Sequence, residues 1–426
     1  MSKFILRGNI IYSKEDKSLS VNEDSFLVCE DNISRGVFSS FDEIPAEYSD
    51  YELIDHGNCL IIPGLVDLHV HAPQYSFRGY NMDEELLDWL DHNTFPEESK
   101  YSDISYADRA YSIFTDDMRN SFTTRASVFA TIHKDATILL MDKLEKSGII
   151  SYVGKVNMTR NSPDTLCETT DESINTTALW LDEISSRYER TKPILTPRFI
   201  PSCDDEVMEK LGEMRKKYDL RVQSHLSENP SEIDWVKELV PASKGYGDAY
   251  HINGMLGDKS NPAIMAHCIY SDEAERALLK ECGTYVAHSP ESNLNLASGI
   301  APIRKMLEEG INVGLATDIA GGSTISMMKA IALTIQVSKM YWRYVDKTAS
   351  PLSFADAFYI ATRGGGKFFG NVGSFENGAE FDALVLDDSA VRTACEVDAL
   401  HRIERAAYSE KDIKISSKYV KGKKLW

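Results

Sequence analysis

Eight short apolar runs, rich in β-branched side chains, alternate with segments of helical spacing through the middle of this chain. The runs cover residues 65–71, 122–129, 149–157, 193–199, 220–226, 263–269, 284–289 and 312–318. Such alternation is typical of repeated β-α units, whose strands pair in parallel. Glycines at positions 148, 283 and 310 fall where helices should end before the next strand. Eight units in about 300 residues predict an α/β fold built on a closed (β/α)8 TIM barrel.

The two ends of the chain have a different pattern. Short strand-like segments precede residue 64, and three more follow residue 370, at 383–386, 413–415 and 419–420. We expect both ends to pair in one small β-sandwich-like domain beside the barrel. The predicted boundaries are residues 1–63 and 371–426 for the small domain and residues 64–370 for the barrel.

Charge, cysteine content and the lengths of the apolar stretches indicate which partners and which location to expect. The chain has 426 residues and a formal net charge of −20. Nucleic acid and anionic membranes need a basic face, so both are excluded as expected partners. Its seven cysteines form no Cys-x-x-Cys pair, and no apolar stretch reaches the length of a membrane span. We therefore expect a cytoplasmic protein.

Polar side chains close most of the apolar runs. His69 and His71 end the first run, and residues two apart in a strand point to the same face. His225, His267 and Asp318 end the fifth, sixth and eighth runs. In a parallel barrel these carboxyl ends meet on one rim, where active sites form. Charged or imidazole groups at the end of a buried strand are costly unless they are paired or bound to metal.

Three imidazoles and one carboxylate form a suitable ligand set for a single ion. His69, His71, His225 and Asp318 would bind zinc or ferrous iron and leave one position for water. His267 would lie beside that water as an orienting group or proton acceptor. The fourth run, residues 193–199, contains no lysine that could bridge two ions, which favours one metal.

Two other residues have both a functional and a structural interpretation. Glu228 follows His225 by three residues and could reach the water and the substrate as a proton shuttle, or it could serve as an acid at a helix N-terminus. His288 ends the seventh run and could be either a site residue or an ordinary core histidine.

These motifs resemble those of the amidohydrolase superfamily, over nearly the whole chain. The general motifs are PGLVDLHVH (63–71), SHLSE (224–228) and TD (317–318). Within the superfamily the chain is similar to the guanine deaminases, through HAPQYSF (71–77), TFPE (94–97), TIH (131–133), TPRF (196–199) and DIAGG (318–322). One departure is AHSPESN (287–293), where related chains often have cysteine after the histidine.

The resemblance implies a hydrolase that converts guanine to xanthine and ammonia, with one zinc ion per subunit and a homodimeric assembly. It implies Glu228 as proton shuttle, and Gln74, Arg198 and Phe199 as contacts to the base. An arginine fork matches the O6 and N7 acceptors of guanine and mismatches the amino group of adenine. Phe199 could equally be core packing.

Two alternatives remain open at this level. One is another deaminase of the superfamily, acting on a related aminopurine, cytosine or a triazine. The other is a non-catalytic barrel that serves as a scaffold, although such relatives generally lose their metal ligands.

Overall fold

The computed structural model describes residues 2–426, and most of its strands lie in parallel sheets at the centre of the chain. One sheet has the order β5 (Leu65–His71), β6 (Thr123–Phe129), β7 (Ile150–Gly154), β9 (Thr191–Pro193). A second has the order β11 (Val222–Leu226), β12 (Ala263–His267), β13 (Tyr285–His288), β14 (Asn312–Leu315). A third pairs β8 (Val156–Asn157) with β10 (Thr196–Pro197).

All eight predicted runs contain strands, but the third and fourth are each broken into two pieces. Pro193 and Pro197 have no N–H to donate, which interrupts regular pairing in the fourth run. Backbone hydrogen bonds still join the sheets at both seams: Gln223 N–H to Leu195 O at 2.9 Å, and Asp318 N–H to His69 O at 2.9 Å. The expected fold is therefore confirmed as an α/β, barrel-like arrangement of parallel strands, and a single closed ladder of eight strands is not formed among residues 2–426.

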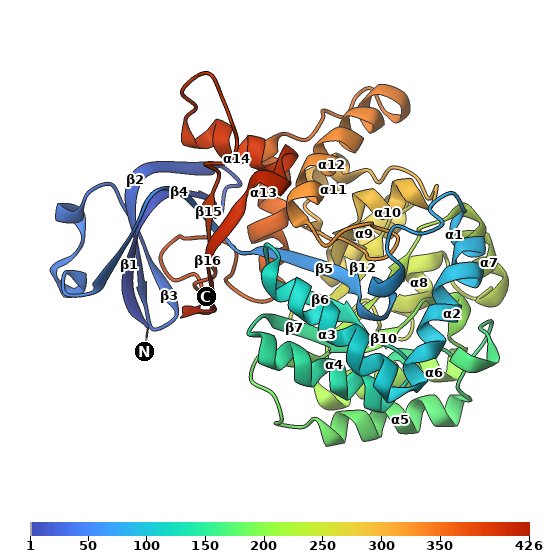
Figure 1. The fold of residues 1–426 in the computed structure, drawn as a ribbon. Coiled ribbons are helices and arrows are strands. Elements are labelled where there is room, and N and C mark those ends of the chain that lie inside the picture. The colour runs from blue at the N-terminus through green and yellow to red at the C-terminus, as the bar shows by residue number, and fades with distance from the viewer. Residues whose placement is uncertain (1) are drawn as a thin grey trace.

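Helices follow most of these strands and cover the outside of the barrel (Figure 1). They are α1 (Leu86–Trp89), α2 (Phe95–Glu98), α3 (Ile104–Asn120), α4 (Lys134–Ser147), α5 (Thr170–Glu183), α6 (Asp205–Tyr218), α7 (Pro230–Leu239), α8 (Tyr246–His251), α9 (Glu273–Cys282), α10 (Pro290–Asn295), α11 (Ile303–Glu309), α12 (Met327–Met340), α13 (Phe354–Tyr359) and α14 (Ala399–Tyr408). Gly148, Gly283 and Gly310 end α4, α9 and α11 in the left-handed conformation, as predicted. Among residues 2–426, no helix combines the length and apolar character needed to cross a membrane.

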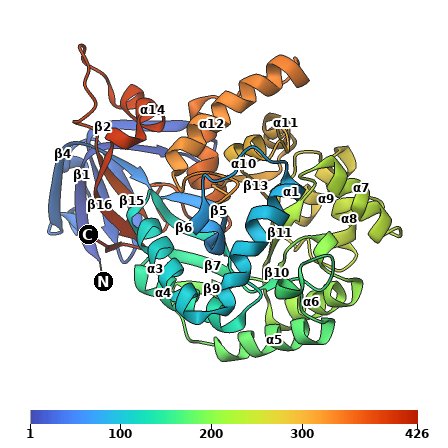
Figure 2. The same ribbon diagram turned by 45° about the vertical axis from the view of Figure 1, so that its right-hand side comes forward.

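The two ends of the chain share one seven-stranded sheet, which lies beside the barrel (Figures 1 and 2). Its order is β17 (Lys423–Lys424), β16 (Lys414–Val420), β15 (Ala383–Asp387), β4 (Glu52–Pro63), β1 (Lys3–Ser13), β2 (Leu19–Glu30), β3 (Ile33–Phe38). Strand β3 and helix α14 were not expected from the sequence. The pairing of the two ends agrees with expectation, and a separate sandwich-like domain bounded at residues 63 and 371 stays a prediction.

Gly64 connects this sheet to the barrel, because β4 ends one residue before it and β5 begins one residue after it. A Cβ atom at Gly64 would lie 2.1 Å from the Thr124 hydroxyl oxygen, far inside van der Waals contact. Only glycine lets β5 pass this close to β6. The Pro63-Gly64 step therefore delivers the first barrel strand, with its two histidines, into the centre of the molecule.

Candidate active site

Four donor groups converge at the carboxyl ends of β5, β11 and the segment after β14. The Nε2 atom of His71 lies 3.1 Å from Nε2 of His69 and 3.2 Å from Nε2 of His225. The Oδ1 atom of Asp318 lies 3.1 Å from Nε2 of His69 and 3.6 Å from Nε2 of His71. The structure thus brings together all four residues that the sequence predicts as metal ligands. Three imidazole nitrogens and one carboxylate oxygen are a donor set suited to a catalytic ion.

The surroundings keep these donors in the forms that bind metal. Burial lowers the pKa of His71 and His225 well below the ordinary value, and the neighbouring imidazoles lower it further, so both rings are neutral. The Nδ1 atom of His225 lies 2.6 Å from the Arg198 carbonyl oxygen and donates to it, which leaves Nε2 with its lone pair. Burial alone would raise the pKa of Asp318, but His69, His267 and His71 together outweigh burial and hold that pKa well below the usual range.

Asp67 forms hydrogen bonds to both of the segments that carry His69 and Asp318. Its Oδ1 atom accepts the backbone N–H groups of His69 at 3.2 Å and Thr317 at 3.1 Å, and its Oδ2 atom accepts the Thr317 hydroxyl at 2.5 Å. Because Thr317 precedes Asp318, this buried carboxyl group fixes the ligand of one strand against the ligand of another. Partners of this kind orient metal ligands.

Glu228 and His267 lie together beside the donor cluster. Nε2 of His267 is 3.3 Å from Oε2 of Glu228 and 3.6 Å from Oδ2 of Asp318, while its Nδ1 is 2.8 Å from the Asn293 amide oxygen. Ser298 donates a hydrogen bond of 2.9 Å to Oε1 of Glu228. Burial raises the pKa of Glu228. Burial lowers the pKa of His267, but Glu228 and Asp318 outweigh it, so that pKa is raised.

The helix-terminus alternative for Glu228 is wrong, because Asn229 caps α7 and Glu232 completes the capping box. Glu228 instead lines a cavity together with three of the four predicted metal donors, His71, His225 and Asp318. The cavity is lined by all three predicted base contacts, Gln74, Arg198 and Phe199. Leu86 and Trp89 of α1 add an apolar wall that the sequence did not indicate.

His288 is not part of this cavity. Both of its ring nitrogens are buried without a hydrogen-bond partner among residues 2–426, and it lines a separate small cavity with Thr334 and Ser338. Burial lowers its pKa to about 3, so the ring is neutral. The structure therefore places His288 outside the candidate site.

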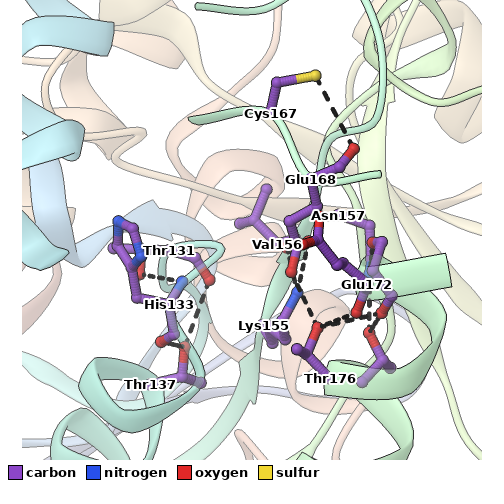
Figure 3. A network of polar contacts seen from close by, with 12 residues as sticks. Thr131, His133, Thr137, Lys155, Val156, Asn157, Cys167, Glu168, Glu172 and Thr176 are labelled. Atoms are coloured by element: carbon purple, nitrogen blue, oxygen red, sulfur yellow. Dashed lines mark hydrogen bonds and ion pairs between the residues drawn. The ribbon is translucent and has the colours of Figure 1, made fainter. Parts of the chain in front are cut away.

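A buried lysine near the end of the third strand is also separate from the donor cluster. Lys155 donates to Oε2 of Glu168 at 2.8 Å and to the Val156 carbonyl oxygen at 3.2 Å, and Glu168 accepts a further bond from Thr176 (Figure 3). The Lys155 amino group is thus paired with Glu168 and lies apart from the metal donors.

Sequence reasoning missed several residues that hold the site. Ser298 forms a hydrogen bond to Glu228, and Asn293 forms one to His267. Both follow the seventh strand: Asn293 lies in a short helix and Ser298 in a loop. Glu98, at the end of α2, accepts hydrogen bonds from Gln74 and Arg198. The signal for Glu98 was weak: it directly follows the motif at residues 94–97, but an acid beside another acid has no distinctive pattern.

Comparison with known proteins gives consistent matches over the whole length. The model of the amidohydrolase family matches residues 60–425. Guanine deaminase of Dictyostelium discoideum is 35% identical and covers 99% of this chain and 98% of its own, and guanine deaminase of Homo sapiens is 40% identical over 77% and 73%. A crystal structure of guanine deaminase from C. acetobutylicum with guanine bound in the active site has 44% identity and a TM-score of 0.94, covering 100% of both chains.

Proposed function

The chain belongs to the amidohydrolase family and, within it, to the guanine deaminases, and on that basis we propose that it hydrolyses guanine to xanthine and ammonia. The observation that carries this proposal is one cavity lined by three metal donors, by the buried carboxyl group of Glu228 and by Arg198, with the fourth donor, His69, beside the other three. A relative with 44% identity over the whole chain contains guanine in its active site.

The donor set fits the metal that the family requires. We propose that His69, His71, His225 and Asp318 hold one zinc ion per subunit, with ferrous iron as the alternative, because three nitrogens and one oxygen suit either ion. When bound, the ion supplies a hydroxide nucleophile at neutral pH.

Residues of the chain itself accept and donate the protons of the reaction. His267 or Asp318 accepts one proton of the attacking water, whose hydroxide adds to C2 of guanine. Glu228 gives a proton to the adjacent ring nitrogen N3 and then relays the proton of the new C2 hydroxyl group to the amine, so that the C2–N bond breaks, ammonia leaves and the C2 carbonyl of xanthine forms. The raised pKa of Glu228 supports this role, because a carboxyl group that keeps its proton closer to neutral pH is a better donor.

The cavity wall supplies the recognition of the base. Arg198 and Gln74 offer N–H donors to the O6 and N7 edge of guanine, whereas adenine presents an amino group at the same place. Leaving such buried donors unpaired discriminates by up to about 10⁴-fold. Phe199 is 7% exposed and lines the same cavity, where its ring is available to pack against the base.

The remaining predictions belong to the same proposal: a separate small β domain, a homodimer and a cytoplasmic location. Seven free cysteines suit a reducing compartment. Light scattering on the purified protein tests the dimer.

The test is an absorbance assay of guanine conversion to xanthine, with metal analysis on the same sample. Glu228→Gln should keep its metal and its fold but lose about 10²-fold or more in turnover. Near-normal turnover of that variant would remove Glu228 from the mechanism. Activity on cytosine, a triazine or another aminopurine in place of guanine would assign a different deaminase, and protein that holds no metal and converts none of them would indicate a scaffold.

A further inference from the structure

Glu98 is a buried acid that accepts hydrogen bonds from two residues of the cavity wall. It is 2% exposed and does not line the cavity itself. Its Oε1 atom accepts a hydrogen bond of 2.9 Å from Nε2 of Gln74, and its Oε2 atom accepts one of 2.6 Å from Nη1 of Arg198. Its two oxygens therefore hold the two polar side chains that face the base.

We propose that Glu98 is a positioning residue that sets the preference for a purine with an oxygen at C6. It does so by turning Gln74 and Arg198 into a fixed pair of donors. This inference rests on the proposed function and extends it to the choice of substrate.

The hydrogen-bond inventory of Gln74 supports this assignment. The Gln74 amide oxygen accepts the Ala320 backbone N–H at 2.9 Å, so the amide cannot turn over without losing both bonds. One of its two N–H groups is bound to Glu98, which leaves one N–H for a ligand. A free glutamine would adapt to a donor or an acceptor, but this one presents a donor.

Arg198 is restrained in the same way. A guanidinium group has five N–H donors and no acceptor, and Glu98 occupies an Nη1 donor. The Arg198 guanidinium carbon also lies 5.3 Å from the ring centroid of Phe95, so helix α2 contacts this side chain through both its first and last residues. The donors that remain free face a cavity in which only an acceptor edge satisfies them.

The neighbouring acid provides a matched control. Glu97 is also buried, but its carboxylate binds Lys100 at 2.6 Å and accepts the Tyr106 hydroxyl, and it contacts neither Gln74 nor Arg198. Glu98→Gln keeps the size of the side chain and replaces one acceptor oxygen by an NH₂ group. That group would face the donor of Gln74 or of Arg198, so one of the two must move. Glu97→Gln makes the same chemical change one residue away.

The experiment compares two purines that lack the C2 amino group and therefore do not react. Hypoxanthine has O6 and N7, whereas unsubstituted purine lacks O6. Each is measured as a competitive inhibitor of guanine deamination, together with KM and kcat for guanine. In the wild-type enzyme hypoxanthine should bind at least about tenfold more tightly than purine, the effect of one buried hydrogen bond. Glu98→Gln should remove most of that difference and raise KM more than it lowers kcat, while Glu97→Gln retains both wild-type values.

Metal content and circular dichroism show that each variant is folded. If Glu98→Gln is insoluble, Glu98→Asp replaces it: the shortened carboxylate reaches only one partner, so the hypoxanthine preference must fall as well. A folded variant at Glu98 that keeps the wild-type preference overturns the inference while guanine deamination stands. Wild-type protein that does not deaminate guanine refutes the proposed function instead.

Discussion

A buried ion pair between Arg125 and Asp382 joins the barrel to the terminal sheet, and its removal should destabilise the protein strongly. Nε of Arg125 donates to Oδ2 of Asp382 at 2.6 Å, and Nη2 donates to Oδ1 of Asp382 at 3.2 Å and to Glu380 at 2.8 Å. Asp382 is fully buried and Arg125 is 2% exposed. Arg125 lies in β6, whereas Asp382 directly precedes β15.

The expected loss of stability depends on which charge stays buried without its partner. Arg125→Met retains the length of the side chain but leaves Asp382 buried without a cation, a change that costs about 3–5 kcal/mol. The Lys421 backbone N–H still donates to Asp382 at 2.7 Å, which favours the lower end of that range. Glu380 adds little, because its side chain is 32% exposed and returns to solvent. We therefore expect a loss of about 3 kcal/mol, or roughly a hundredfold in the unfolding equilibrium.

A double-mutant cycle with Asp382→Asn is the decisive assay. The double variant removes both members of the buried ion pair, so it should be more stable than the sum of the single effects predicts, by about 1–3 kcal/mol. Because a chain of this size need not unfold in one step, stability is read from the first urea transition and from hydrogen exchange in β15. Strictly additive effects, or a loss below about 0.5 kcal/mol for Arg125→Met, would refute the reasoning.

Two further predictions concern groups around the metal centre. Thr317→Val removes the hydroxyl that donates to Asp67, so it should weaken metal retention by about tenfold in a chelator competition, and unchanged retention would contradict the role given to Asp67. Burial, and then the charge of Glu228, raise the pKa of Glu232 to about 7. Between pH 4.5 and 7 the unfolded chain loses this proton and the folded chain keeps it, so the metal-free protein should lose about 3 kcal/mol of stability as the pH rises. Glu232→Gln should remove that component in urea titrations at pH 5 and 8, and an identical pH dependence in both proteins would exclude it.

The candidate metal donors could be predicted from the sequence because, in a barrel of parallel strands, a residue's place at the end of its strand predicts where it lies in space. His69 and Asp318 are far apart in the chain, but each lies at the carboxyl end of its strand, and parallel strands end on the same rim. His288 obeys the same rule and still faces another cavity, since the rule places a strand end without giving the direction of the side chain. The breaks in the third and fourth runs depend on local pairing that periodicity does not report.

The residues that hold the donors could not be found in this way. Ser298 and Glu98 lie in a loop and in a short helix, where no strand period fixes their place. Their partners, Glu228 and Arg198, are distant in the sequence, so the contacts depend on the path of connections that the sequence pattern leaves undetermined. The motifs therefore indicated the candidate acting groups but not the residues that form hydrogen bonds to them.

The two carboxyl groups beside His267 show how the fold gives similar side chains different tasks. Asp318 faces the imidazoles of His69, His267 and His71, and these contacts hold its pKa well below the usual range, so it stays an anion that can bind a cation. Glu228 is equally buried, but a single hydroxyl and one imidazole are its polar partners, and burial raises its pKa. Separated pKa values of this kind assign the acid and the anion in an active site. Because His267 lies 3.3 Å from one carboxyl group and 3.6 Å from the other, a proton accepted on the side of Asp318 has a short path to Glu228. In the proposed mechanism this path would let the proton removed from water replace the one that Glu228 gives to the base.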